Sequence, residues 1–320
     1  MQATVKTEYN EPLIPNRADP YVCKENGLYY FTASVPEYDR IVLRCATTIK
    51  GLAKAEEKEI WHCHETGKMA KHIWAPELHY VMGGWYIYFA AGENPDIWAI
   101  RPYVLKCTGN DPMKDDFVEL GMMQAADDDE FSFKSFSLDM TVFEANKEWY
   151  CVWAEKVGVG KMISNLYIAK LETPNKLKTV QVLLTTPDYD WERIGFWVNE
   201  GPYVLKHDGK LFLTFSASAT GACYCVGMLA ADENADLLDP RSWEKFRDPV
   251  LKTDYEKHVY GPGHNCFVKS EDDTKDIMIY HARPYEKIEG DPLYDPNRHT
   301  MMLTVEWKDG LPVFNFEKQN

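Results

Sequence analysis

The sequence predicts an all-β fold built from five similar units, and a repeated pattern is the main reason for this prediction. The clearest copy lies at 198–215, where Glu200 precedes Gly201-Pro202, a short apolar strand, a turn at 207–209 and a second apolar strand. Such a pattern is typical of a β-hairpin with a polar residue at its open end. Helical periodicity is almost absent from the chain, which favours strands throughout.

Four other stretches repeat this hairpin, at 17–31, 74–89, 137–153 and 262–281. The polar residues of the five copies recur at intervals of 58, 62, 61 and 64 residues: Asp19, Glu77, Asp139, Glu200 and His264. A repeat near this length that contains only strands and turns indicates the blade of a β-propeller. We therefore predict a five-bladed β-propeller with four antiparallel strands per blade, formed by residues 1–320 as a single catalytic domain.

Further strands and two irregular segments complete the predicted blades. Third strands are expected at 41–47, 103–107, 165–171 and 222–230. The stretches 109–136 and 283–300 lack a strand pattern, and long loops on a rigid scaffold often carry binding residues. We expect both to lie on the rim.

Composition narrows the classes of partner. Hydrophobic residues make up 45% of the chain and aromatic residues 13%, which is enough for a buried core. The net charge is −15, and this disfavours nucleic acid and anionic membranes, because phosphate groups would be repelled. Neutral partners such as sugars are unaffected by this charge.

The first fifteen residues have neither the basic nor the apolar region of a secretory signal. Eight cysteines are scattered through strand-like segments, without the spacing of disulfide frameworks or metal sites. Such cysteines are typical of buried, reduced thiols. We therefore expect a cytoplasmic protein, although a signal removed beforehand would leave no trace.

The geometry of a propeller suggests a function for the five polar residues. The innermost strand of each blade starts near the axis, so polar residues at one register would meet at one mouth. They could simply hydrate an axial channel or cap strand ends, but burying several unpaired carboxylates is costly without a function. Two carboxylates across a pocket suit glycosidic cleavage, and a third could orient the acid and raise its pKa.

Four short sequence motifs support a resemblance to a known enzyme family: Arg17-Ala18-Asp19-Pro20, Trp74-Ala75-Pro76-Glu77, Ser137-Leu138-Asp139 and Glu200-Gly201-Pro202. In this order the chain resembles glycoside hydrolase family 43, whose members are five-bladed propellers with an inverting mechanism. The resemblance implies that Asp19 is the general base, Asp139 orients and tunes the acid, and Glu200 is the general acid. It implies no cofactor for the chemistry.

The resemblance also bears on the two remaining polar residues. It implies that His264 stands on the axis below the site, where it could hold a structural calcium ion through water. Glu77 lies outside the catalytic three, and we expect it to be structural, binding backbone amides.

The phrases 280–283 and 290–299 resemble the branch of α-L-arabinofuranosidases. This implies an exo-enzyme that releases terminal arabinofuranosyl residues from oligosaccharides or hemicellulose side chains. Arg298 matches an arginine that reaches sugar hydroxyls, unless it is a surface loop residue. Trp74, Phe136 and Trp197 could form apolar walls against the sugar, or they could be core aromatics between blades.

Several alternatives stay open at this point. A β-xylosidase or galactofuranosidase of the same family, or an inactive sugar-binding propeller, fits the same repeats. The phrases of retaining fructosidases are absent, which makes that class a distant second. A protein-interaction propeller of the tryptophan-aspartate type would show a repeat of about 40–45 residues, which this chain lacks.

Overall fold

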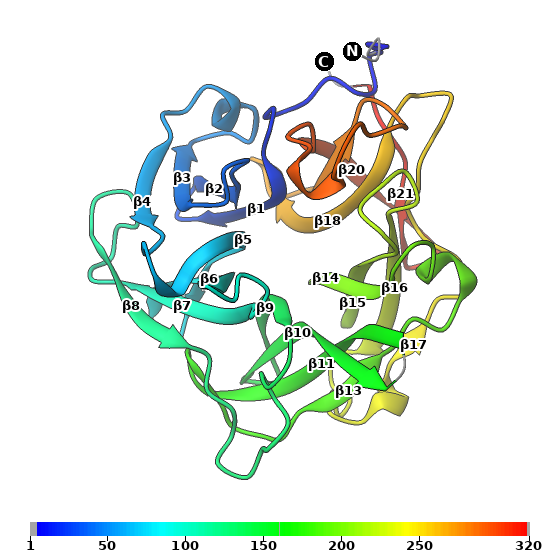
Figure 1. The fold of residues 1–320 in the computed structure, drawn as a ribbon. Helices are drawn as coiled ribbons and strands as arrows, with labels where there is room; N and C mark the ends of the chain where they lie inside the picture. Colours follow the sequence, from blue (N-terminus) through cyan, green and yellow to red (C-terminus); the bar gives the residue numbers. More distant parts are fainter. Residues whose placement is uncertain (1–4, 160, 319–320) are drawn as a thin grey trace.

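The computed structural model describes residues 5–159 and 161–318, which form five blades around a central axis (Figure 1). The predicted five-bladed, all-β fold is confirmed. Each blade is built from antiparallel strands in chain order. Within the described ranges the helical segments are four short 3₁₀ turns: Lys50–Ala53, Asp190–Glu192, Pro240–Ser242 and Pro292–Tyr294.

Blades 1, 2 and 5 are separate four-stranded sheets. Blade 1 consists of β1 (Ala18–Glu25), β2 (Leu28–Ser34), β3 (Arg40–Ala46) and β4 (Lys58–His62). Blade 2 consists of β5 (Gly67–Val81), β6 (Gly84–Asn94), β7 (Arg101–Cys107) and β8 (Phe117–Met122). Blade 5 consists of β18 (Tyr260–Lys269), β19 (Asp276–Arg283), β20 (His299–Lys308) and β21 (Leu311–Phe314). Strand β8 occupies part of the segment 109–136, which the sequence predicted to be a loop.

Blades 3 and 4 are joined into one continuous sheet. Blade 3 contains β9 (Ser137–Ala145), β10 (Glu148–Val159), β11 (Lys161–Thr173), β12 (Lys176–Leu177) and β13 (Val182–Thr185). Blade 4 contains β14 (Trp197–His207), β15 (Lys210–Ala217), β16 (Cys225–Asp232) and β17 (Glu244–Lys245). The start of β11 extends beyond its own blade and pairs in parallel with the start of β14. This junction lies at the end of the blades where the inner strands begin.

The hairpins follow from local sequence. Asn26-Gly27 and Asp208-Gly209 connect the first two strands of blades 1 and 4, and all four residues have positive φ. Two-residue turns of this kind match the twist of antiparallel strands and favour Asn, Asp and Gly. The predicted turns at these positions are therefore confirmed.

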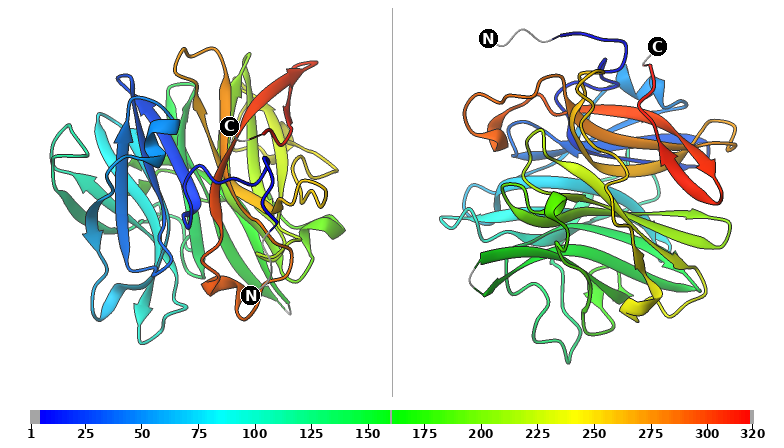
Figure 2. Two further views of the ribbon diagram at one scale, coloured as in Figure 1. Left: turned by 90° about the horizontal axis from the view of Figure 1, so that it is seen from above. Right: turned by 90° about the vertical axis from the view of Figure 1, so that its right-hand side faces the viewer.

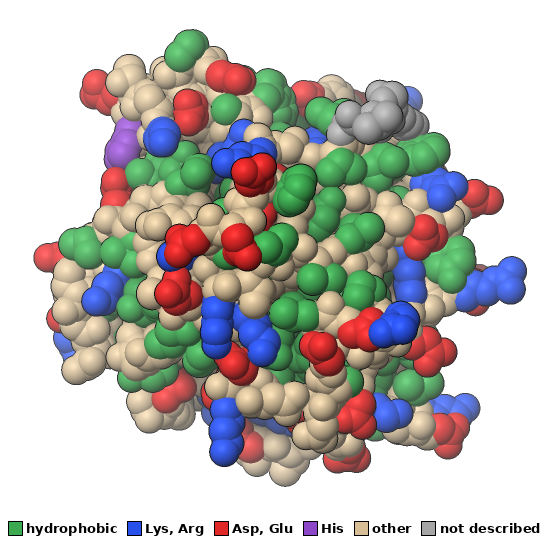
Figure 3. All heavy atoms as spheres, turned by 90° about the horizontal axis from the view of Figure 1, so that it is seen from below, with side chains coloured by type: hydrophobic (Ala, Val, Ile, Leu, Met, Phe, Trp, Pro, Cys, Tyr) green, Lys and Arg blue, Asp and Glu red, His purple; other side chains and the backbone are tan. Residues whose placement is uncertain are grey.

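Apolar faces of neighbouring blades form the core. Phe31 of blade 1, Phe89 of blade 2 and Ile279 of blade 5 belong to one buried cluster. The ring is closed by the segment before β1, where Thr300 of β20 exchanges backbone hydrogen bonds with Ile14. Figures 1 and 2 show this N-terminal segment beside blade 5. Charged side chains of both signs are scattered over the face shown in Figure 3.

Each innermost strand carries a β-bulge at the same place. Its pairing with the second strand skips two residues, for example between Ala18 and Tyr21 in blade 1. The first skipped residue has a left-handed φ of 46–54° in every blade: Asp19, Ala75, Asp139, Gly201 and His264. These residues, at intervals of 56, 64, 62 and 63, are the structural equivalents of one another. A bulge of this kind redirects side chains at the mouth of the ring.

The register predicted from sequence is therefore wrong in two blades. Glu77 lies two residues beyond the bulged position of blade 2, and Glu200 lies one residue before that of blade 4. The error has a physical reason, because the bulge breaks the alternation of strand residues and a polar residue beside it can still reach the axis. The bulged residues of these two blades are Ala75 and Gly201, so a search for polar residues could not identify them.

Side chains of the preceding blade accept the backbone N–H of four bulged residues. The donor–acceptor pairs are Ala75 to Ser34 (2.8 Å), Gly201 to Asp139 (3.0 Å), His264 to Ser216 (2.7 Å) and Asp19 to His281 (3.1 Å). These bonds satisfy donors that the bulge removes from the sheet. They also tie each of these bulges to its neighbour, so that the mouth is held by contacts between blades.

Candidate active site

A cavity of about 630 Å³ opens at the mouth of the ring. Its lining includes Asp19, Asp139, Glu200 and His264, so the structure brings these four predicted residues together. Glu77 is not among the lining residues. It instead accepts a hydrogen bond of 2.6 Å from the ring of His79, which differs from the expected contact with backbone amides.

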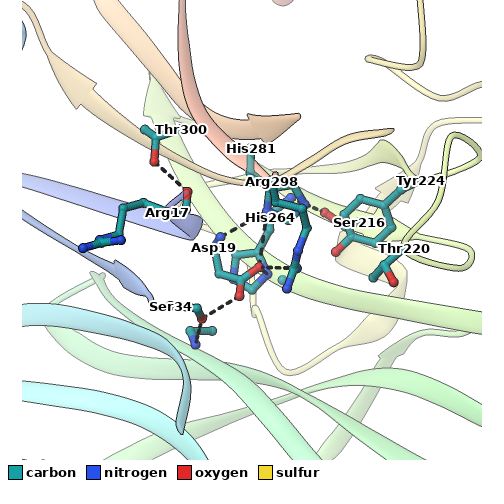
Figure 4. Close-up of polar contacts among 12 residues, drawn as sticks. Arg17, Asp19, Ser34, Ser216, Thr220, Tyr224, His264, His281, Arg298 and Thr300 are labelled. Carbon is teal, nitrogen blue, oxygen red and sulfur yellow. Dashed lines mark hydrogen bonds and ion pairs between the residues drawn. The ribbon is translucent and has the colours of Figure 1, made fainter. Parts of the chain in front are cut away.

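Asp19 lies in a dense set of polar contacts (Figure 4). Ser34 Oγ donates to its Oδ2 at 2.6 Å, and Arg298 Nη1 donates to its Oδ1 at 3.1 Å. The Nδ1 atom of His264 lies 3.5 Å from the same Oδ1. Burial alone would favour the neutral acid, but Arg298 and His264 hold the pKa of Asp19 well below its usual range. Asp19 is therefore ionised at neutral pH.

His281 fixes the backbone of Asp19 as a neutral ring. Its Nδ1 accepts the Asp19 N–H, and the imidazole is almost fully buried. Burial lowers the pKa of His281 to about 3, so the ring keeps an acceptor at Nδ1 over the physiological range. The ring also stacks in parallel with that of Tyr224, with centroids 5.6 Å apart.

Asp139 and Glu200 have few polar partners. Asp139 Oδ2 accepts the N–H of Gly201, and Glu200 Oε1 accepts the hydroxyl of Tyr224 at 2.9 Å. Burial raises the pKa of both carboxyl groups, and repulsion from other carboxylates adds to this effect. The pair therefore retains a proton near neutrality, because two neighbouring carboxylates of like charge repel each other.

The sequence of blade 3 explains why Asp139 accepts the N–H of Gly201, the residue after Glu200. In blades 1 and 4 a serine of the second strand, Ser34 or Ser216, pairs with the residue before the bulge and accepts the N–H of the next blade. The corresponding residue of blade 3 is Ala154, which has no acceptor in its side chain. The carboxylate of Asp139 takes this place.

Gly201 is required for a reason other than its φ, because other blades carry larger residues at the same φ. A Cβ atom on Gly201 would lie 3.1 Å from Nδ1 of His264. This imidazole stands between Asp19 and Asp139, 3.8 Å from Oδ2 of the latter. Although burial lowers the pKa of His264, the surrounding carboxylates raise it above the ordinary value. A cationic imidazole there would link the two acids.

The side chains near His264 do not form a direct metal site. Among residues 5–159 and 161–318, no group of three or more His, Cys, Asp or Glu side chains could hold a metal ion. Calcium also prefers oxygen ligands to an imidazole nitrogen. A calcium ion near His264 would thus take mostly water ligands, and it stays a prediction.

The four residues predicted to bind substrate also line the cavity: Trp74, Phe136, Trp197 and Arg298. The aromatics are therefore not confined to the core between blades. Arg298 is 7% exposed and donates to the hydroxyl of Tyr38 as well as to Asp19. It is not a surface loop arginine. Its first structural effect is to hold the carboxylate of Asp19.

Sequence reasoning missed several residues of the cavity. Lys156, Trp98 and Phe196 line it, and Tyr224 binds Glu200. Lys156 and Tyr224 lie within strand-like runs that gave no signal of their own. Trp98 and Phe196 are 52% and 64% exposed. Both lie in irregular segments beside a repeat motif, and an aromatic residue in such a loop is a signal that could have identified these two.

The fold and the site define a propeller with a carboxylate-lined central cavity. The family model of the glycosyl hydrolases family 43 matches residues 9–312. The chain belongs to this family, as the resemblance implied.

The chain is also similar to individual relatives and to a crystal structure. The chain is 48% identical to an extracellular exo-α-(1→5)-L-arabinofuranosidase of Streptomyces avermitilis over 98% of its length, and it spans 64% of that relative. It is 47% identical to an enzyme of the same name from Streptomyces chartreusis, covering 89% of this chain and 85% of the relative. The crystal structure of an α-L-arabinofuranosidase from Lactobacillus brevis matches with a TM-score of 0.90, 48% identity and 96% coverage of both chains.

Both Streptomyces relatives are named as extracellular, and this contradicts the expected cytoplasmic location. The cysteines were a poor indicator for a physical reason. All eight are free, and burial raises the pKa of thiols such as Cys151 and Cys266. Because the thiolate is the reactive form, buried thiols stay reduced in an oxidising compartment as well. Separately, the described part of the chain contains no helix long and apolar enough to span a membrane.

Proposed function

We propose that this protein is an exo-acting α-L-arabinofuranosidase that inverts the anomeric configuration. One observation carries the proposal: a single cavity holds Asp19, whose pKa is lowered, together with Asp139 and Glu200, whose pKa values are raised. An ionised base and a protonated acid are the two groups that glycoside hydrolysis by inversion requires. The names of the relatives above support arabinofuranosides as substrates.

In the proposed reaction, Asp19 accepts a proton from the attacking water. Arg298 and Ser34 occupy both carboxylate oxygens from one side, which fixes the orientation of the base. Glu200 donates its proton to the departing glycosidic oxygen. Tyr224 binds one oxygen of Glu200, and burial raises the pKa of Glu200. In the proposed mechanism repulsion from Asp139 adds to this effect, so the acid is oriented and protonated before the bond breaks.

Exo action is supported by a loop that is held in place at one side of the cavity. Pro292 and Leu293 line it, and their loop is held at two points. Tyr38 donates to the carbonyl of Leu293 at 2.6 Å. Arg283 donates to the carbonyls of Pro292 and of Thr220, across the boundary between blades 4 and 5. A loop fixed in this way would stop a polysaccharide chain from running through the site.

We assign the apolar walls of the sugar site to Trp74, Phe136 and Trp197. The indole of Trp74 stacks on His72, with ring centroids 4.5 Å apart, so its orientation is fixed before a sugar binds. Flat apolar surfaces suit the C–H faces of a furanose. A contact of Arg298 with a sugar hydroxyl is also proposed, in addition to its bond to Asp19.

The test has two parts. The purified protein is incubated with 4-nitrophenyl α-L-arabinofuranoside, β-D-xyloside and β-D-galactofuranoside, and with α-1,5-linked arabino-oligosaccharides. We expect arabinose as the first product, released from the non-reducing end. The anomer of that first product is then followed by NMR before mutarotation. Preferred hydrolysis of a xyloside or galactofuranoside would refute the substrate, and retained configuration would refute Asp19 as a base.

A further inference from the structure

Lys156 is a cavity residue to which the reaction described above gives no part. It lies on β10, its side chain is partly buried, and it lines the cavity. Its Nζ atom stands 3.7 Å from the centroid of the Phe136 ring, and its backbone N–H binds the carbonyl of Phe136. Among the residues that the structure describes, no polar group accepts a hydrogen bond from this ammonium. An ammonium has three donors, so they are available to a ligand.

The junction of blades 3 and 4 places Lys156 on the same wall as the proposed acid. Lys156 pairs with Ser164 of β11, and Ser164 pairs with Val198 of β14. All three line the cavity. Glu200 follows Val198 by two residues, before the bulge, so the two side chains lie on the same face of β14. The row from Lys156 to Glu200 crosses the junction at which blades 3 and 4 form one continuous sheet.

The chemistry of the reaction indicates which part of the substrate contacts the wall that carries Lys156 and Glu200. The general acid contacts the oxygen that leaves with the departing sugar. The departing sugar therefore lies on the side of Glu200, beyond the bond that breaks. On this wall an ammonium over an aromatic ring offers donors for hydroxyl groups and an apolar face for C–H groups.

We propose that Lys156, seated on Phe136, binds a hydroxyl or ring oxygen of the departing sugar and so sets the preference for a sugar over other leaving groups. The assignment rests on the proposed role of Glu200 as the acid. It names a specificity-determining residue on the leaving-group side, next to the apolar wall of the sugar site, because Phe136 belongs to that wall and also contacts Lys156.

Electrostatics give an independent consequence of the same geometry. Burial lowers the pKa of Lys156, while the negative charge of Glu200 opposes this. In return, the ammonium lowers the pKa of Glu200 against the larger effect of burial. Removal of the charge therefore raises the pKa of the acid. Because the acid must be protonated, the alkaline limb of the pH profile should move to higher pH.

The test compares Lys156→Met, which removes charge and donors, with Lys156→Gln, which keeps a donor. Lys210→Met is the matched control, because Lys210 is an exposed lysine beside the turn at Asp208-Gly209. Values of kcat and KM are measured on arabinobiose and on 4-nitrophenyl α-L-arabinofuranoside, whose leaving group is not a sugar. For Lys156→Met we expect kcat/KM on arabinobiose to fall about 10- to 100-fold, as for loss of a hydrogen bond from a charged donor.

The loss on the aryl glycoside should be smaller by at least about fivefold, and Lys156→Gln should recover part of the activity on arabinobiose. The alkaline limb on arabinobiose should move up for both Lys156 variants and stay in place for Lys210→Met. Equal losses on both substrates, or no loss on arabinobiose, would overturn the proposal. Melting temperatures of all variants show whether a loss of activity reflects unfolding. If Lys156→Met unfolds, Lys156→Gln is used to compare arabinobiose with the aryl glycoside.

Failure of the proposed function can be told apart from failure of this inference. If the wild-type protein does not cleave arabinosides, the proposed function fails. The comparison is then made with the glycosyl group that the wild type does accept, as an aryl glycoside and as a disaccharide. If the wild type cleaves arabinobiose but the variants lose activity equally on both substrates, only the inference about Lys156 fails.

Discussion

The two sides of the cavity differ in how they treat a buried carboxylate. On the side of blades 1 and 5, Asp19 is surrounded by Ser34, Arg298 and His264, and its backbone by His281. On the side of blades 3 and 4, the hydrogen-bond partners are one backbone N–H for Asp139 and one tyrosine hydroxyl for Glu200. His264 also lies 3.8 Å from Asp139, but among the described residues neither acid has an arginine partner like that of Asp19. Asp19 and Asp139 are buried and Glu200 is partly buried, and desolvation favours the neutral form of all three, so desolvation alone does not distinguish them.

The number and charge of the partners decide the outcome. Cationic and hydrogen-bonding groups outweigh desolvation at Asp19 and lower its pKa. At Asp139 and Glu200 desolvation wins, and the pKa of each rises. Environments that separate the pKa values of nearby carboxyl groups assign a base and an acid within one cavity. The following predictions test this contrast, from the largest effect to the smallest.

Replacement of Asp19 should have the largest effect. We expect Asp19→Ala to lower kcat by about 10⁴-fold even on aryl glycosides, because water must still be activated whatever the leaving group. Rates on 4-nitrophenyl α-L-arabinofuranoside measure this. Asp19→Asn is the matched control, since it keeps the volume beside Arg298. Activity of either variant within tenfold of the wild type would contradict the role of a base.

The loss of activity in Glu200→Gln should depend on the leaving group. On arabinobiose we expect a loss of about 10²- to 10⁴-fold, since the departing alkoxide needs a proton. On aryl glycosides with acidic phenols the loss should be much smaller, because these leaving groups depart without protonation. Plots of log kcat/KM against the pKa of the phenol check this. A slope unchanged from that of the wild type would argue against Glu200 as the acid.

Asp139→Asn should shift the pH profile. Its amide can still accept the Gly201 N–H, but repulsion against Glu200 is lost, so the pKa of Glu200 falls. The acid is then deprotonated at lower pH, and the alkaline limb should move down. This is the opposite of the shift expected for Lys156→Met. Measurement of kcat/KM on arabinobiose from pH 4 to 9 tests it, and a limb that stays in place would exclude Asp139 from tuning the acid.

The same contrast should appear in stability. A lowered pKa at Asp19 stabilises the fold above the unfolded value of about 3.9, and this is lost as the pH falls through the folded pKa. A raised pKa at Asp139 does the reverse, so its stability is lost as the pH rises above about 4. We expect Asp139→Asn to raise the melting temperature at pH 8 by several degrees, with little change at pH 4. Asp19→Asn should lower it at pH 7, because Arg298 loses its partner.

Chelation should have the smallest effect. If calcium binds near His264 through water, treatment with EDTA should lower the melting temperature by a few degrees, with recovery on adding calcium rather than magnesium. The imidazole would remain tied to Asp19 and Asp139, so most of the structure should persist. An unchanged melting temperature and activity after exhaustive chelation would leave His264 as a hydrogen-bonding residue alone.

The sequence by itself determined the hairpins, the number of blades and the residues around the three acids. Asn26-Gly27 and Asp208-Gly209 encode their turns locally, and local signals are readable because neighbouring residues supply all the interactions. The motifs around Asp19, Asp139 and Glu200 could be aligned for the same reason. These features could be predicted without knowing which blades are in contact.

Only the tertiary structure decided the register at the mouth and the protonation of the acids. The bulge that separates Glu77 from its apparent equivalents is set by pairing with a second strand, and Ser34 joins Asp19 to Ala75 of the next blade. The pKa of Asp19 depends on Arg298, 279 residues away in the chain. Desolvation and Coulomb interactions act through space, so a linear pattern can identify a carboxylate but cannot set its charge.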